Sequence, residues 1–308
     1  MAMKHIPVML AEVIKCLSPA DGKVYVDATF GNGGYSEAIL KAADCKVIAI
    51  DRDPNVVERA NEVGAKYKNR FSFLFGCFGD IDRLVKEPVD GIVFDIGVSS
   101  MQIDEADRGF SFAKDGKLDM RMSCDGVSAF DLVNNLPEKE LADLIYNFGE
   151  EKKSRQIAAK IVEERKQKPI STTKELADIV HKVVFNKKAA PDSAMRTFQA
   201  LRIAVNDELG QLESGLENGV KILKNGGRMV VVTFHSLEDR IVKNFFNSNT
   251  AKKVHVSRYK TDDCKDLLAK FEKCSKAIFP SAEEIAVNSR AHSAKLRFAI
   301  KNLGGKNE

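Results

Sequence analysis

The sequence predicts an α/β protein built on a doubly wound, Rossmann-like parallel sheet that an all-helical block interrupts. First, short β-branched runs alternate with helical periodicity over the first hundred residues, which is the pattern of parallel βαβ units. Second, the sequence turns purely helical after about residue 104. Third, a strand pattern returns at residues 228–234 (RMVVVTF). The helical block is therefore predicted to be an insertion between the fourth and fifth strands.

Four strands are predicted before the insertion. They cover residues 23–28, 46–51, 71–75 and 91–96. Helices are predicted to begin at about Tyr35 and after Pro54, so strands and helices alternate. The first strands run into acidic or glycine-rich turns, and open α/β sheets bind their ligands at that edge. We therefore expect the binding site at the carboxyl ends of these strands.

The inserted block shows apolar residues at helical spacing. They follow Pro137, recur around residues 157–162, and follow a capping-box pair at Thr172 and Glu175. A long helix is predicted from about Arg196, with apolar positions continuing to residue 223 and a stop at Asn225-Gly226-Gly227. A last strand, residues 295–301, is predicted at an edge of the sheet.

These patterns divide the chain into two domains. Residues 1–105 and 205–308 are predicted to form one discontinuous α/β domain, and residues 106–204 an inserted helical domain for substrate recognition. The net charge of +4 is unevenly spread, because residues 150–202 and residues 251–308 each carry 13 Lys and Arg against 7 Asp and Glu. Such asymmetry is typical of a protein with a polyanion-facing side, although solvated helix faces would also produce it.

The composition excludes several classes of protein. No apolar run approaches the roughly 18 residues that a membrane span needs. The six cysteines are scattered without a CxxC pair or histidines at zinc-finger spacing, so they read as reduced thiols. We therefore expect a cytoplasmic protein without a metal site.

A glycine-rich turn, DATFGNGGY from Asp27, follows the first strand and opens the first helix. Gly33 and Gly34 lack side chains and so let backbone N–H groups approach a ligand. A dinucleotide site would need G-x-G-x-x-G, but position 36 is Ser36 and an acid precedes the glycines. This arrangement suits a ligand that carries an ammonium group and no phosphate.

Further candidate ligand residues follow the second, third and fourth strands. Asp51 ends the second strand, where it can accept hydrogen bonds from both hydroxyls of a ribose. Phe78 could stack on a purine or be an ordinary core residue. Asp95 ends the fourth strand, with Gln102 just beyond it. The glycine turn and Asp51 together favour a phosphate-free, adenosine-containing cofactor.

The fifth strand leads into a dense polar string, HSLEDR from His235. Such a cluster is costly to bury, so we expect it to line the site, with His235 best placed to meet a substrate. The alternative is that His235 is a structural partner of Glu238 or Asp239.

Over almost its full length the chain resembles the family of the ribosomal RNA small subunit methyltransferase H. The resemblance rests on the strings HIPVML, DATFGNGGYSEAIL, AIDRDP, FDIGVSSMQID, RGFSF, LDMRM, RTFQALRIAVNDEL, FHSLEDRIVK and NSRAHSAKLR. It implies a class I methyltransferase fold and S-adenosylmethionine as cofactor. The implied cofactor contacts are Gly33, Gly34, Tyr35, Asp51, Phe78, Asp95 and Gln102. Tyr35 stands where many relatives have histidine, and we expect its contact to be made through the backbone.

The resemblance also implies a reaction, namely methylation of the N4 amine of a cytidine in the decoding, P-site region of bacterial 16S rRNA. Asp95 is a candidate acceptor for the amine hydrogen, although the D-P-P-Y string of other amino-methyltransferases is absent, and His235 is a candidate contact to the base. The target nucleotide must be unpaired or flipped out. The candidate RNA contacts are Arg108, Arg121, Arg196 and Arg290. The expected partner is 16S rRNA or the small ribosomal subunit, and a homodimer is left open.

Two alternatives belong to other functional classes. A NAD(P)-dependent oxidoreductase could share the fold, but the third glycine spacing and a Tyr-x-x-x-Lys pair are missing. A non-enzymatic RNA-binding protein could keep a vestigial pocket, but the retained Asp27, Gly33, Asp51 and Asp95 argue against it.

Overall fold

The computed structural model describes residues 7–184, 194–250 and 269–303. It divides into two compact units, of which the first comprises Met1–Gly97 with Leu209–Glu308 and the second Val98–Glu208. The second unit lies in the chain between β4 and β5, where an insertion is expected from the sequence. Among the helices of the described residues, none is long and apolar enough to cross a bilayer.

The first unit contains one sheet, in which the described residues contribute seven strands in the order β3-β2-β1-β4-β5-β7-β6. The strands are β1 (Val24–Asp27), β2 (Lys46–Asp51), β3 (Phe71–Phe75), β4 (Val89–Asp95), β5 (Leu223–Thr233), β6 (Phe271–Cys274) and β7 (Lys295–Lys301). The pairs among β1 to β5 are parallel, and β7 runs antiparallel to both β5 and β6. The doubly wound α/β prediction is thus confirmed.

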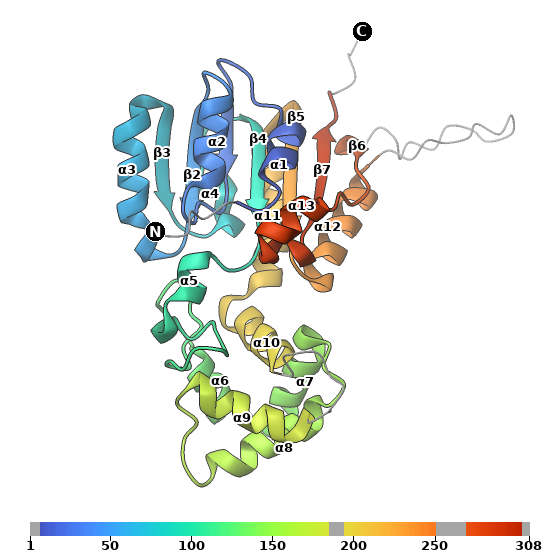
Figure 1. Ribbon diagram of the computed structural model, residues 1–308. Coiled ribbons are helices and arrows are strands. Elements are labelled where there is room, and N and C mark those ends of the chain that lie inside the picture. The colour runs from blue at the N-terminus through green and yellow to red at the C-terminus, as the bar shows by residue number, and fades with distance from the viewer. Residues whose placement is uncertain (1–6, 185–193, 251–268, 304–308) are drawn as a thin grey trace, which may run out of the picture. The chain divides into compact units, whose positions relative to one another are not determined.

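Helices cover both faces of this sheet (Figure 1). The α-helices of this unit are α1 (Leu10–Leu17), α2 (Gly34–Ala42), α3 (Val57–Tyr67), α4 (Ile81–Leu84), α11 (Glu208–Ile222), α12 (Ser236–Asn249) and α13 (Ala282–Val287). Its short 3-10 helices are η1 (Pro54–Val56), η2 (Lys68–Arg70), η3 (Phe78–Asp80) and η6 (Ser289–Ser293). Successive strand residues face opposite ways. Tyr25 accordingly packs with α1 and α2 in one core, and its neighbours Val24 and Val26 pack with α11 and α12 in the other.

Two predictions about the strands of this sheet were wrong. The strand of residues 295–301 is not at the edge, because β6 pairs along its other side. The sequence of β6, FEKC, is only four residues long and half charged, so it gives no hydrophobic signal. The fifth strand begins at Leu223 rather than at residue 228 and continues through Gly226, whose φ of 75° only glycine adopts readily.

The long helix predicted from about Arg196 is two helices, α10 (Met195–Asn206) and α11. Asp207 separates them with a left-handed φ of 48°. The Asn206 side chain stabilises this break, because it donates to the Met120 carbonyl at 2.7 Å and accepts from the Met122 N–H at 2.8 Å. The apolar spacing continues through both helices, so periodicity could not reveal the break.

The second unit is helical around its own core. Its other helices are α5 (Ser100–Asp104), η4 (Ala106–Arg108), α6 (Ala129–Asn135), α7 (Glu138–Gly149), α8 (Ser154–Arg165) and α9 (Thr173–Val184). The predicted capping pair is confirmed: the Glu175 N–H donates to the Thr172 hydroxyl, and the Thr172 N–H to the Glu175 carboxylate, both at 3.2 Å. Leu141, Ile145 and Ile157 are fully buried in the core, as their helical spacing predicts.

Candidate functional site

Three carboxylates occupy equivalent positions in the first unit. Asp27, Asp51 and Asp95 are the last residues of β1, β2 and β4. These strands are parallel neighbours, so their carboxyl ends share one edge of the sheet. At that edge open α/β sheets bind ligands.

The glycine turn lies at the same edge, between β1 and α2. Gly33 caps α2 with a φ of 77°, and a Cβ there would come within 2.9 Å of the Phe30 ring. A Cβ on Gly34 would come within 2.2 Å of the Pro7 ring. Conformation and close packing therefore both favour glycine at position 33, and close packing against Pro7 favours it at position 34.

Asp27 holds both ends of this turn. Its side chain is fully buried, and its Oδ2 accepts from the Ser36 N–H at 3.1 Å and from the Ser36 hydroxyl at 2.7 Å. Its Oδ1 accepts from the Thr29 N–H at 3.3 Å. Burial raises the pKa of Asp27 to about 6. These bonds give Asp27 a structural role in the turn that its position in the sequence did not reveal.

Asp51 is connected to the turn from the second strand. Its Oδ2 accepts from the Gly31 N–H at 2.7 Å, and its Oδ1 accepts from the Asp53 N–H at 2.9 Å. A carboxylate offers about four lone-pair sites, so each oxygen keeps capacity for a further donor. Burial raises the pKa of Asp51.

Asp95 is the most unusual of the three carboxylates. Its backbone N–H donates to the Thr29 hydroxyl at 2.7 Å, whereas its Oδ1 is buried without a hydrogen-bond partner among the described residues. Burial, reinforced by the charges of Asp27 and Glu238 and opposed by that of Arg290, raises the pKa of Asp95 to about 8. A buried polar atom without a partner is rare in proteins, and it marks a position where a ligand donor can bind.

His235 and Glu238 form a reciprocal cap at the start of α12. The His235 Nδ1 accepts from the Glu238 N–H at 3.5 Å, and the Glu238 Oε2 accepts from the N–H groups of Phe234 and His235 at 2.7 and 3.1 Å. The His235 Nε2 lies 2.9 Å from the Glu238 Oε1, although without hydrogen-bond alignment. Both ring nitrogens thus face Glu238. This agrees with the alternative in which His235 is a structural partner of Glu238.

From the sequence, Glu238 is expected only as a candidate partner of His235 and not as a neighbour of Asp95. It is fully buried and close enough to raise the pKa of Asp95. The sequence position of Glu238 could have indicated the cap that it forms with His235. Glu238 lies three residues after His235, which is the spacing of a capping box, although a capping box usually begins with serine or threonine and not histidine. Asp239 instead faces β7, where Arg297 donates to it at 2.7 Å.

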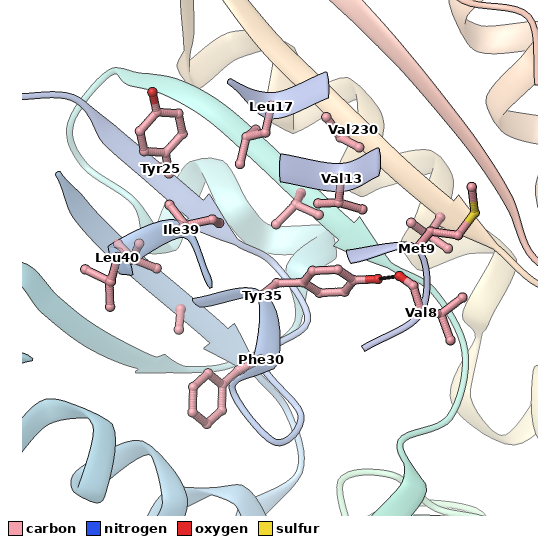
Figure 2. Packing of buried hydrophobic residues seen from close by; sticks show 14 of the residues in the cluster. Val8, Met9, Val13, Leu17, Tyr25, Phe30, Tyr35, Ile39, Leu40 and Val230 are labelled. Atoms are coloured by element: carbon pink, nitrogen blue, oxygen red, sulfur yellow. Dashed lines mark hydrogen bonds between the residues drawn. The ribbon is translucent and has the colours of Figure 1, made fainter. Parts of the chain in front are cut away.

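The rings of Phe78 and Tyr35 both pack against other residues of the first unit. The half-buried Phe78 ring packs edge-on to Phe94, with centroids 5.8 Å apart, and lies against Gly215 of α11. The Tyr35 side chain is 3% exposed, and its hydroxyl donates to the Val8 carbonyl (Figure 2). This leaves the backbone of Tyr35 for the predicted cofactor contact, which stays a prediction.

The other predicted contacts lie mainly in the second unit. Gln102 is buried there, and its side chain accepts from the Ser99 N–H at the start of α5. Arg108 donates to the carbonyls of Arg121 and Met122, and Arg121 to Asp119. These contacts give Arg108 and Arg121 structural roles that the sequence did not reveal.

The last two predicted arginines differ from each other. The Arg196 side chain is 55% exposed and donates to the Glu150 carbonyl. Arg290 belongs to η6 of the first unit, where its charge acts on Asp95. Lys187 and Lys188, two of the cations in the basic stretch, lie outside the described residues.

The sheet topology and this ligand edge define a class I, S-adenosylmethionine-dependent methyltransferase fold. The chain matches the model of the MraW methylase family over residues 2–302, and it belongs to that family. It is therefore a methyltransferase, and neither the oxidoreductase nor the non-enzymatic alternative is supported.

Curated relatives match along the whole chain. The ribosomal RNA small subunit methyltransferase H of Rickettsia akari (strain Hartford) is 53% identical over 98% of this chain and 100% of its own length. The protein of the same name from Rickettsia bellii (strain OSU 85-389) is also 53% identical, with the same coverage. Among solved structures, SMU.1697c, a putative methyltransferase from Streptococcus mutans in complex with SAH, aligns with a TM-score of 0.44 and 12% identity, over 96% of this chain and 99% of that one.

Proposed function

We propose that the chain transfers a methyl group from S-adenosylmethionine to the N4 amine of a cytidine in the P-site decoding region of 16S rRNA. The names of the rickettsial relatives support ribosomal RNA of the small subunit as substrate. The cytidine and its position follow from the resemblance of the sequence motifs. Such an enzyme would work in the cytoplasm on rRNA or on the small subunit. The homodimer stays a prediction, because neither the relatives' names nor the single chain supports it.

The residues at the ligand edge fit this cofactor. The first-turn N–H groups of a helix lack intrahelical partners, so those of α2 can receive a carboxylate where Gly33 and Gly34 admit one. Asp51 can take the ribose hydroxyls, Phe78 the purine, and Gln102 is retained as a predicted contact. When bound, S-adenosylmethionine supplies a methyl group activated by a positively charged sulfur.

The Oδ1 of Asp95, which has no hydrogen-bond partner in the part of the chain that the structure describes, is the observation that carries the proposed chemistry. The N4 lone pair of cytosine is delocalised into the ring, so an acceptor that draws on an N4 hydrogen makes the nitrogen more nucleophilic. The amine must also lose a proton when its new N–C bond forms. Asp95 has an acceptor atom without a partner among the described residues, and its pKa of about 8 lies near neutral pH, so its ionised fraction can receive this proton. We retain His235 as the contact to the base, oriented by Glu238.

Docking of the RNA is assigned to the helical second unit, which we propose as the substrate-recognition domain. The stretch of residues 150–202 carries a charge of +6, more than the net charge of the chain. Arg196 is exposed within it and can meet a phosphate. Arg108, Arg121 and Arg290 remain proposed contacts.

The proposed function is tested on rRNA from cells that lack the gene for this protein. Nucleoside mass spectrometry should show that N4-methylcytidine is lost from one position of 16S rRNA and restored by the intact gene. Loss of a 5-methyl or ribose-methyl group instead would contradict N4 transfer, and an unchanged methylation profile would contradict the function as a whole.

A further inference from the structure

The start of the described chain, Pro7–Met9, packs directly on the glycine turn. The Pro7 ring lies so close to Gly34 that a Cβ on the glycine would come within 2.2 Å of it. Gly34 is the first residue of α2, in the turn whose N–H groups are proposed to receive the cofactor. The Pro7 ring therefore packs directly against the backbone of the turn at Gly34.

The Tyr35 hydroxyl fixes the next residue of this segment. It donates to the carbonyl of Val8, as Figure 2 shows, from a side chain that is 3% exposed. The ring belongs to the apolar cluster of α1 and α2 that contains Val13 and Ile39. Buried packing on both sides leaves the ring little freedom, so the position of the hydroxyl is well defined.

A third contact joins the segment to the carboxyl-terminal part of the first unit. The Met9 N–H donates to the Glu284 carboxylate at 2.5 Å, and the Met9 side chain is fully buried. Glu284 belongs to α13, which precedes η6 and its Arg290. Met9 has a left-handed φ of 53°, a conformation that is uncommon for a methionine and needs surrounding contacts to hold it.

We propose that Pro7–Met9 is a strap that holds the glycine turn in its cofactor-binding shape, with Tyr35 as the positioning residue that secures the strap. The proposal rests on the proposed use of this turn for S-adenosylmethionine. It gives Pro7–Met9, which belong to the described part of the HIPVML string, a role in binding, although these residues lie far in sequence from the glycines. Tyr35 acts through Val8 and Pro7, so its hydroxyl affects the cofactor without touching it.

The test compares Tyr35→Phe with Tyr25→Phe in the full-length protein. Tyr25 is a matched control, since it is also 3% exposed and its hydroxyl also bonds to backbone, at Ala20 and Ser18, away from the glycine turn. Tyr35→Phe should raise the Kd and the KM for S-adenosylmethionine by about tenfold, the equivalent of roughly 1.4 kcal/mol, while kcat at saturating cofactor stays near the parental value. Tyr25→Phe should lower Tm comparably without changing either constant.

A second variant tests the route through the strap. Pro7→Ala removes the ring from Gly34 and should also weaken cofactor binding. If both residues act through one strap, the double variant should lose less affinity than the sum of the two single losses. A parental Kd in Tyr35→Phe, an equal loss in Tyr25→Phe, or strict additivity would each overturn the proposal. Failure of the parent protein to bind S-adenosylmethionine would instead contradict the proposed function.

Discussion

The Thr29 hydroxyl accepts the backbone N–H of Asp95 at 2.7 Å and so joins the chain beyond β1 to the end of β4. The bond fixes the backbone of Asp95 while its Oδ1 remains without a partner among the described residues. The backbone at Asp95 is therefore held by the fold, and its carboxyl group still has an acceptor atom for a ligand.

Asp95→Asn should change how stability depends on pH. The pKa of Asp95 is raised from 3.8 to about 8 by burial and by the charges of Asp27 and Glu238, against the charge of Arg290. Between these pKa values the native protein holds a proton that the unfolded chain has lost, so the free energy of unfolding falls as pH rises.

Denaturant unfolding of the cofactor-free protein measures this dependence from pH 5 to 8.5. The variant should show the shallower fall and should be the more stable protein at pH 8.5. Identical slopes for the variant and the parent would mean that Asp95 does not titrate in this window.

Asp51→Ala should weaken S-adenosylmethionine binding by about 1–3 kcal/mol, since the ribose hydroxyls would lose their acceptor. The Gly31 N–H would lose its partner too, so part of the effect could come from the turn itself. Asp51→Asn keeps one acceptor oxygen and separates the two contributions. Calorimetry provides the readout, and unchanged affinity in Asp51→Ala would remove the residue from the site.

His235→Ala and Glu238→Gln together distinguish a base contact from a structural cap. If His235 also aligns the cytosine, His235→Ala should lower the single-turnover rate of the folded fraction by about a hundredfold while cofactor affinity changes little. If His235 only caps α12, both variants should lower Tm, by an amount equivalent to about 0.5–2 kcal/mol, and the methylation rate of the folded fraction should be parental. A full rate in a destabilised His235→Ala protein would exclude the base contact.

Arg196→Glu should weaken RNA binding and flatten its dependence on salt. One lost phosphate contact lowers the slope of log K against log salt by about 0.9 on duplex RNA or about 0.7 on a single strand, taking the values known for DNA. Lys86→Glu makes the same charge reversal at an exposed site of the first unit and is the control. If the two variants behave alike, the charge of the second unit acts only through the net charge of the protein.

Much of the fold could be predicted because the parallel strands carry short β-branched runs between helices of regular spacing. β6 could not, since four half-charged residues give no such signal, and the break at Asp207 depends on the contacts of Asn206 with a distant loop. The positions of Asp51 and Asp95 at the ligand edge could be predicted because each residue ends a recognisable strand. The buried cap of Glu238, the bonds of Asp27 and the Tyr35–Val8 contact depend on how side chains pack, which local spacing does not encode.

The most direct test of the account is single-turnover methyl transfer by Asp95→Asn to 16S rRNA, at cofactor concentrations that saturate the variant. Saturation removes the effect of any weaker cofactor binding, so the rate reports on the acceptor alone. We expect N4-methylcytidine as the product of the parent protein, formed at least about a hundredfold more slowly by the variant, as for loss of a general base. A parental rate of N4 methylation in Asp95→Asn would contradict the account.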